Sequence, residues 1–117
     1  MGRLTTHVLD TAHGTPGAGM ALTLYRCVGE RLEALRSATT NAEGRLTVPL
    51  LEGADFLPGR YRLVFAAGAY FRQRGMALPE PPFVDQVVID FGVADAAAHY
   101  HIPLLVSPWS YSTYRGS

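Results

Sequence analysis

Residues 99–106 read HYHIPLLV, and this stretch decides the fold class. Side chains alternate between the two faces of a β-strand, so one face here carries Tyr100, Ile102, Leu104 and Val106. The opposite face carries His99, His101, Pro103 and Leu105. A wholly apolar or aromatic face is typical of a strand that packs one side against a core. We therefore predict a sandwich strand with His101 on its outer face.

Similar runs rich in Val, Thr, Tyr and Leu recur along the chain between Gly, Pro and Asn turns. They predict further strands over residues 3–11, 20–28, 31–40, 45–50, 60–67, 83–91 and 110–115. Residues 68–75 (GAYFRQRG) predict one short helix, with Gly75 as its stop signal. Eight short strands and one helix indicate an all-β sandwich with Greek-key-like connections, forming a single domain over residues 1–117.

Composition limits the classes of partner. Ten basic residues balance ten acidic ones and the pI is about 6.9, which argues against a nucleic-acid partner. No apolar run approaches the roughly 20 residues that span a bilayer, so we expect no membrane association. The single cysteine, Cys27, cannot form an internal disulfide. A lone cysteine fits a reducing compartment, and the expected location is the cytoplasm.

Histidine and arginine supply the candidate functional groups. His7 shares its predicted strand face with Thr5 and Leu9, while His13 and His99 are expected in an exposed turn and at a strand start. His101 is either a solvated surface residue or part of a site. Pro103 favours a specialised strand, because proline gives up a ladder hydrogen bond. Arg45 follows the turn NAEG and is either a surface charge or a guanidinium aimed at a ligand.

Other kinds of chemistry have no signal. No Cys/His grouping has the spacing of a zinc site, and the pair His99 and His101 lacks the rest of a coordination shell. No G-x-S-x-G elbow marks a serine nucleophile. We expect neither a metal nor a cofactor.

Three segments carry a resemblance to a known family. They are THVLDTAHGTPGAGM (6–20), TTNAEGR (39–45) and HYHIPLLVSPWSYSTYRGS (99–117). Together they resemble the 5-hydroxyisourate hydrolases, the transthyretin-related proteins, in the same order along the whole chain. The tetrapeptide YRGS at 114–117 is the hallmark of that family. Serum transthyretin, the hormone-carrying relative, is similar in the VLD and SPWSYST segments but lacks the two histidines and the YRGS ending.

The resemblance implies a prealbumin-like sandwich of two four-stranded sheets with one short helix, assembled as a homotetramer. Its active sites would lie in the groove between two dimers, lined by the outer faces of the first, seventh and eighth strands. Residue by residue, it implies catalytic roles for His7, Arg45 and His101. It implies substrate contacts for His7, Arg45, Tyr114 and Ser117, and a structural role for Arg115 and Gly116.

The implied reaction is hydrolysis of 5-hydroxyisourate to 2-oxo-4-hydroxy-4-carboxy-5-ureidoimidazoline in urate degradation, by opening a ring amide bond. A histidine pair suits this step, since a group with a pKa near about 6.5 can act as base or acid at neutral pH. The sequence leaves open whether His7 or His101 activates the water. The alternative is a transthyretin-like carrier of a flat aromatic ligand in the same groove.

Overall fold

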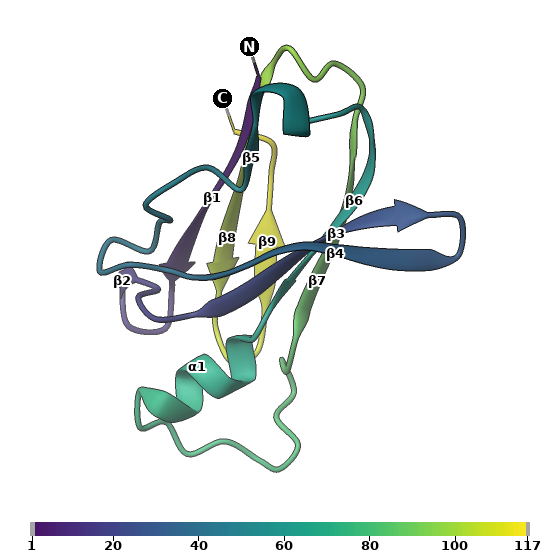
Figure 1. Ribbon diagram of the computed structural model, residues 1–117. Helices are drawn as coiled ribbons and strands as arrows, with labels where there is room; N and C mark the ends of the chain where they lie inside the picture. The colour runs from purple at the N-terminus through teal and green to yellow at the C-terminus, as the bar shows by residue number, and fades with distance from the viewer. Residues whose placement is uncertain (1, 117) are drawn as a thin grey trace.

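Two β-sheets pack against each other in the computed structural model, which describes residues 2–116 (Figure 1). The first sheet has the order β2–β1–β8–β9, with strands Thr15–Pro16, Arg3–Asp10, His99–Val106 and Tyr111–Thr113, and β5 (Leu51–Glu52) also pairs with β1. The second has the order β4–β3–β6–β7, with strands Arg31–Thr39, Ala21–Val28, Gly59–Phe65 and Val87–Val93. A 3₁₀ turn, Gly53–Asp55, follows β5, and the helix α1, Ala67–Gln73, follows β6.

The all-β sandwich with one short helix is confirmed, with two differences in detail. The first sheet has five strands instead of four, because the two-residue strands β2 and β5 both pair with β1. The strand predicted over residues 45–50 is wrong: only Arg45 forms a bridge, to His7, and pairing resumes at β5. Pro49 lies in this segment and has no N–H to donate to a ladder.

The alternation of faces is confirmed in both strands that carry the candidate histidines. In β1, Leu4 and Val8 are buried while Thr5 and His7 on the opposite face are half-buried. In β8, the residues that point inward are all buried: Tyr100, Ile102, Leu104 and Val106. Pro103 differs from the other outward residues because it is buried within the chain. The hydroxyl of Thr113 in β9 donates a hydrogen bond of 2.7 Å to the carbonyl of Pro103.

β1 and β8 pair in parallel, which joins the beginning of the chain to its end. In this register Arg3 lies opposite His99, Thr5 opposite His101, and His7 opposite Pro103. Neighbours on parallel strands point to the same face of the sheet. Three of the four histidines therefore lie on one outer surface.

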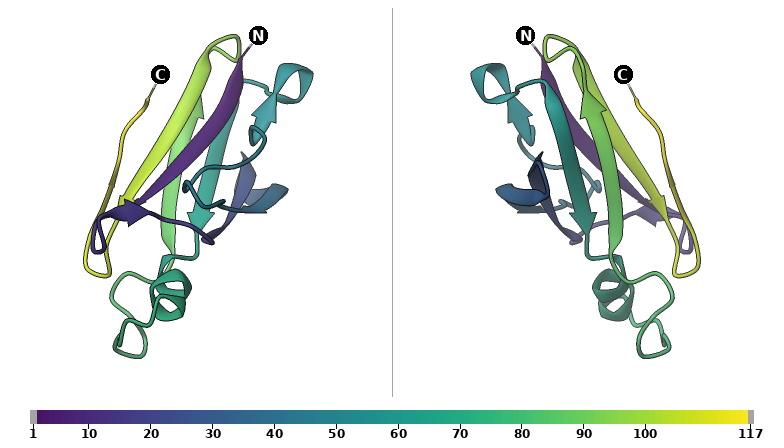
Figure 2. Two further views of the ribbon diagram at one scale, coloured as in Figure 1. Left: turned by 90° about the vertical axis from the view of Figure 1, so that its left-hand side faces the viewer. Right: turned by 90° about the vertical axis from the view of Figure 1, so that its right-hand side faces the viewer.

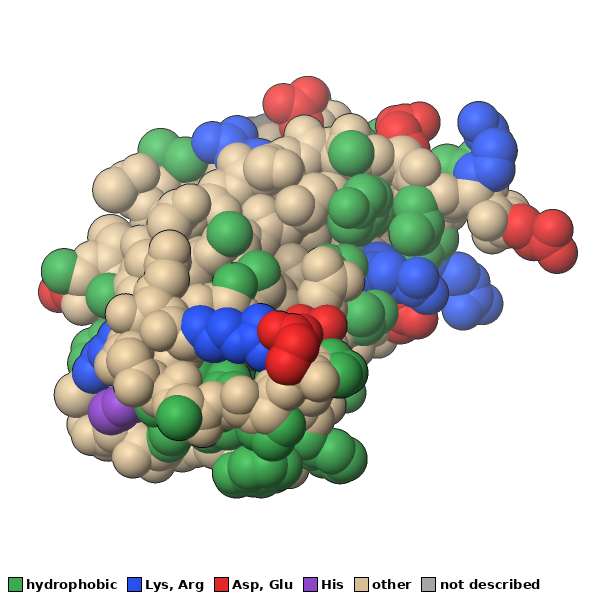
Figure 3. All heavy atoms as spheres, turned by 90° about the horizontal axis from the view of Figure 1, so that it is seen from below, with side chains coloured by type: hydrophobic (Ala, Val, Ile, Leu, Met, Phe, Trp, Pro, Cys, Tyr) green, Lys and Arg blue, Asp and Glu red, His purple; other side chains and the backbone are tan. Residues whose placement is uncertain are grey.

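The helix closes the end of the sandwich that lies away from the two chain ends (Figure 2). Tyr70 and Phe71 of α1 are buried, and Gly75 has a φ of 85°, which agrees with its predicted role as a stop. Acidic and basic side chains are interspersed with hydrophobic ones on the face seen from this end (Figure 3). Within residues 2–116, no helix has the length and apolar character needed to cross a membrane.

Candidate functional site

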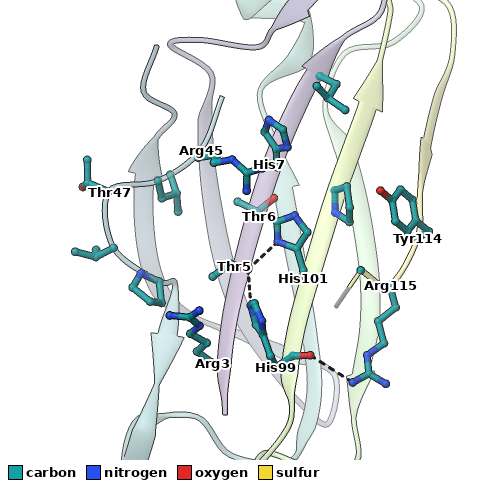
Figure 4. Close-up of a pocket in the computed structure, with 16 residues that line it drawn as sticks. Arg3, Thr5, Thr6, His7, Arg45, Thr47, His99, His101, Tyr114 and Arg115 are labelled. Atoms are coloured by element: carbon teal, nitrogen blue, oxygen red, sulfur yellow. Dashed lines mark hydrogen bonds between the residues drawn. The ribbon is translucent and has the colours of Figure 1, made fainter. Parts of the chain in front are cut away.

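A groove of about 760 Å³ lies over the outer faces of β1 and β8 (Figure 4). The segment around Arg45 borders it on one side and the end of the chain on the other. It is lined by every candidate site residue of the sequence analysis that the structure describes: His7, Arg45, His101, Tyr114, Arg115 and Gly116. Ser117 lies outside the described residues, so its expected contact with substrate stays a prediction.

A tight turn positions Arg45 beside β1. The side-chain oxygen of Asn41 accepts hydrogen bonds from the backbone N–H groups of Glu43 (2.9 Å) and Arg45 (3.1 Å). Gly44 closes the turn with a φ of 76°, and its carbonyl accepts the N–H of Val8 at 2.8 Å. A Cβ on Gly44 would lie 2.4 Å from the Val8 carbonyl oxygen, so only glycine permits this approach. Docking the turn on β1 sets Arg45 opposite His7.

His7 is held as a neutral imidazole. Its Nε2 donates a hydrogen bond of 3.2 Å to the backbone carbonyl of Glu43. Burial lowers the pKa of His7 below 6.5, and the positive charge of Arg45 lowers it further, although the Glu43 contacts partly oppose them. At neutral pH the ring therefore keeps one nitrogen lone pair, which can accept a proton.

His101 lies close to two other histidines and to a hydroxyl. Its ring centroid is 6.5 Å from that of His7 and 6.3 Å from that of His99. The Thr5 hydroxyl is 2.7 Å from Nδ1 of His101 and 2.9 Å from Nε2 of His99. Burial lowers the pKa of His101, and Arg45, His7 and His99 lower it further. Both His7 and His101 are thus neutral at neutral pH.

The end of the chain packs against β8 beside these rings. The backbone N–H of Gly116 donates to the carbonyl of His101 at 2.7 Å, and a Cβ on Gly116 would lie 2.9 Å from Cδ2 of His101. Arg115 stacks its guanidinium carbon 4.0 Å from the centre of the Tyr100 ring and donates to the carbonyl of His99 at 3.4 Å. Tyr114 is 60% exposed at the border of the groove.

Thr5 and His99 both line the groove, although the sequence analysis assigned neither of them a role in the site. His99 was expected to be exposed, yet it is half-buried and contacts Thr5. The parallel register of β1 on β8 brings the two together, and the alternation pattern does not reveal which strands pair. One feature of the sequence did point to these two residues: Thr5 shares a strand face with His7, and His99 shares one with His101.

The chemistry available in this groove is proton transfer next to a fixed positive charge. Two neutral imidazoles can accept or donate protons, and the Arg45 guanidinium can stabilise negative charge on a bound ligand. Within residues 2–116, no group of three or more His, Cys, Asp or Glu side chains is arranged to hold a metal ion.

Comparison with characterised proteins identifies close relatives over the whole chain. The 5-hydroxyisourate hydrolase of Pseudomonas aeruginosa is 62% identical over 117 residues, covering 100% of this chain and 93% of the relative. The 5-hydroxyisourate hydrolase of Ralstonia nicotianae is 59% identical, and the match covers 100% of this chain and 100% of the relative.

Solved structures share the fold. The structure of (S)-allantoin synthase matches 99% of this chain with a TM-score of 0.94 and 44% identity, and this chain spans 44% of that longer chain. The 5-hydroxyisourate hydrolase of Klebsiella pneumoniae matches with a TM-score of 0.82 and 37% identity over the full length of both chains. Sea bream transthyretin, solved with thyroxine, matches 97% of this chain and 94% of its own with a TM-score of 0.87 and 28% identity.

The profile of the HIUase/Transthyretin family matches residues 4–116. This match covers nearly the whole sandwich, including both histidine strands and the turn that carries Arg45. The chain therefore belongs to the HIUase/Transthyretin family.

Proposed function

We propose that this chain hydrolyses 5-hydroxyisourate to 2-oxo-4-hydroxy-4-carboxy-5-ureidoimidazoline, a step of urate degradation. The observation that carries the proposal is the pair of neutral imidazoles, His7 and His101, with ring centroids 6.5 Å apart beside Arg45. The relatives at 62% and 59% identity bear the name of this hydrolase, which supports the same reaction here.

The proposed reaction needs a base, a stabiliser of negative charge and a proton for the leaving nitrogen. One histidine of the pair takes a proton from water as the water attacks the ring carbonyl, and the other orients the substrate or delivers a proton. Arg45 pairs with the electron-rich oxygens of the substrate and stabilises the oxyanion. Loss of one such donor typically costs about 2.7–4 kcal/mol of transition-state stabilisation. The mechanism requires no metal and no cofactor.

The tyrosine and serine of the terminal tetrapeptide are assigned to substrate binding. Tyr114 borders the groove and supplies both an aromatic ring and a hydroxyl. Ser117 is assigned the same role by the family resemblance alone. Arg115 and Gly116 are assigned a structural role, supported by their contacts with the backbone of His99 and His101.

Substitution of His101 tests the function. We expect His101→Asn to lower kcat for freshly generated 5-hydroxyisourate by about 10²–10⁴-fold, the range for losing a side chain that transfers a proton or stabilises the oxyanion. Decay of substrate absorbance in the ultraviolet provides the assay. His13→Asn is the matched control, because His13 lies outside the groove and pairs with Asp10. Near wild-type turnover by the His101 variant contradicts the proposal.

A carrier of a flat aromatic ligand is the second candidate, favoured by the likeness to transthyretin solved with thyroxine. The two functions differ in a simple binding test. A carrier binds thyroxine analogues and leaves the decay of 5-hydroxyisourate unchanged, whereas the enzyme accelerates the decay and binds the analogues weakly. The three histidines and three arginines along the groove favour a polar substrate.

We also propose that the chain forms a cytoplasmic homotetramer whose subunits cover the open groove. In the described residues, β7 pairs only with β6 and β9 only with β8, so each sheet has an edge free to pair with a second copy. A second copy would also cover the exposed aromatic residues in and around β9, which are Trp109, Tyr111 and Tyr114. Light scattering of the purified protein measures the subunit number directly.

A further inference from the structure

We propose that Thr5 is a positioning residue that keeps the proton of neutral His101 on Nε2, so that His7 is the general base and His101 donates a hydrogen bond to the substrate. This inference rests on the proposed hydrolysis and deepens it, because it divides the work between the two histidines. It follows from the hydrogen-bond partners of three imidazole rings. Figure 4 shows two of these contacts, from Thr5 to His99 and from Thr5 to His101.

The partner of His7 fixes its tautomer. Nε2 of His7 contacts the backbone carbonyl of Glu43 at 3.2 Å, and a carbonyl can only accept a hydrogen bond. Nε2 therefore carries the proton of the neutral ring. Because a neutral imidazole has one N–H, Nδ1 of His7 holds the lone pair, and His7 is the ring equipped to accept a proton from water.

The partner of His101 is a hydroxyl, which allows two patterns. Thr5 has one proton and contacts two ring nitrogens, so it donates to one and accepts from the other. In the first pattern, His99 donates from Nε2 to Thr5, and Thr5 donates to Nδ1 of His101. In the second, both bonds are reversed, and both rings then carry their proton on Nδ1.

Intrinsic chemistry selects the first pattern. A neutral imidazole side chain in water carries its proton preferentially on Nε2, and the first pattern gives both His99 and His101 this tautomer. The second pattern places both rings in the less favoured form. Thr5 therefore donates to Nδ1 of His101, and Nε2–H of His101 is left without a hydrogen-bond partner inside residues 2–116.

With these tautomers, every proton that moves in the proposed hydrolysis has a donor and an acceptor. Nδ1 of His7 takes a proton from water as the new C–O bond forms, and Nε2–H of His101 and the Arg45 guanidinium stabilise the oxyanion. The His7 imidazolium then gives the same proton to the ring nitrogen as the C–N bond breaks. His101 stays neutral throughout, as suits a hydrogen-bond donor to an oxyanion.

Nitrogen-15 NMR of the histidine rings tests the tautomers without any substrate. At about pH 8.5, two units above the ordinary histidine pKa, His7 and His101 are neutral, because burial and the Arg45 charge lower the pKa of each ring. We expect His7, His99 and His101 to carry the proton on Nε2. His13 is the internal reference with the opposite pattern, because its Nδ1 lies 2.6 Å from the Asp10 carboxylate, which can only accept. Protonation of His101 on Nδ1 overturns the inference.

Two variants of Thr5 test its positioning role. Thr5→Val removes the hydroxyl at nearly constant volume, and we expect kcat to fall about tenfold, the usual worth of one hydrogen bond. The Nε2–H share of His101 falls to the intrinsic preference of a free imidazole, and the ring loses the bond that fixes its orientation. Thr5→Ser restores both values. An unchanged His13 signal shows that each variant is folded, and wild-type turnover in Thr5→Val contradicts the positioning role.

The two proposals fail separately. If the wild-type protein does not accelerate the decay of 5-hydroxyisourate, the proposed function is wrong whatever the tautomers are. If turnover is fast but His101 is protonated on Nδ1, the hydrolase stands and the division of roles is wrong.

Discussion

Gly116→Ala should damage the site while leaving the fold intact. The added Cβ would lie 2.9 Å from Cδ2 and 3.2 Å from Cβ of His101. Carbon atoms in favourable contact are about 3.5–4.0 Å apart, so the two segments must separate by about 0.6–1.1 Å. The tail and the imidazole share this displacement, because the Gly116 N–H is bonded to the His101 carbonyl at 2.7 Å.

That displacement sets the expected loss of activity. Among residues 2–116, the His101 side chain is held by one hydrogen bond, 2.7 Å from the Thr5 hydroxyl, which a shift of this size breaks or bends. Misplacement of a reacting group by about 1 Å can cost about 10²-fold in rate. We expect kcat for 5-hydroxyisourate to fall about 10- to 100-fold. The free energy of unfolding should change by about 1 kcal/mol or less, because the tail lies at the surface.

The assay compares two glycine variants. Decay of freshly generated 5-hydroxyisourate gives kcat, and urea unfolding gives stability. Gly92→Ala in β7 is the matched control, since a Cβ there meets no atom within 4 Å. If Gly116→Ala turns over substrate as fast as Gly92→Ala does, contact between the tail and His101 does not matter for catalysis.

Two pH dependences follow from other contacts. Burial and the Arg45 charge lower the pKa of His7 below 6.5, so activity should be level near neutrality and fall only as the pH drops below 6.5. Arg45→Gln should move this fall in activity to higher pH. A wild-type pH profile of activity with its midpoint above 6.5 would contradict the role of His7 as the base. Burial raises the pKa of Asp10, but hydrogen bonds from Tyr70 and His13 outweigh it and place that pKa below 3.8. The stability that Asp10 contributes is therefore present above pH 3.8 and is lost as the pH falls through the lower folded-state pKa. Asp10→Asn should lower the free energy of unfolding by about 1–3 kcal/mol at pH 7. In urea unfolding, the difference between wild type and variant should shrink below pH 3.8. An equal difference at pH 3 and pH 7 refutes the stabilising role of the Asp10 carboxylate.

The faces of the strands could be predicted from the sequence, because alternation is a local property. Four apolar residues in β8 face the core, and His101 lies outside, as the pattern indicated. The same rule placed Thr5 and His7 together on the outer side of β1. The helix and its glycine stop were also predicted from local signals. The predicted helix, residues 68–75, differs from α1 by one residue at its start and two at its end.

Pairing between distant strands could not be predicted in this way. Periodicity does not tell which strands are neighbours, so the parallel register of Thr5 on His101 has no signal in the alternation of either strand. For the same reason His99 was expected at an exposed strand start. The segment after Arg45 resembled a strand in composition, yet after the Asn41 turn it forms only the single bridge to His7 before β5.

The site is assembled chiefly through the backbone, which separates its chemistry from the stability of the fold. The Arg45 turn docks through the Gly44 carbonyl on the N–H of Val8, and the tail docks through the Gly116 N–H on the carbonyl of His101. Glycine at both docking points allows the backbones to approach without a side chain between them. The side chains of His7 and Arg45 consequently add little to this docking: His7 contributes one exposed hydrogen bond of 3.2 Å, to the carbonyl of Glu43. Their substitution should therefore change turnover far more than stability, whereas alanine at Gly44, 2.4 Å from the Val8 carbonyl, should cost both.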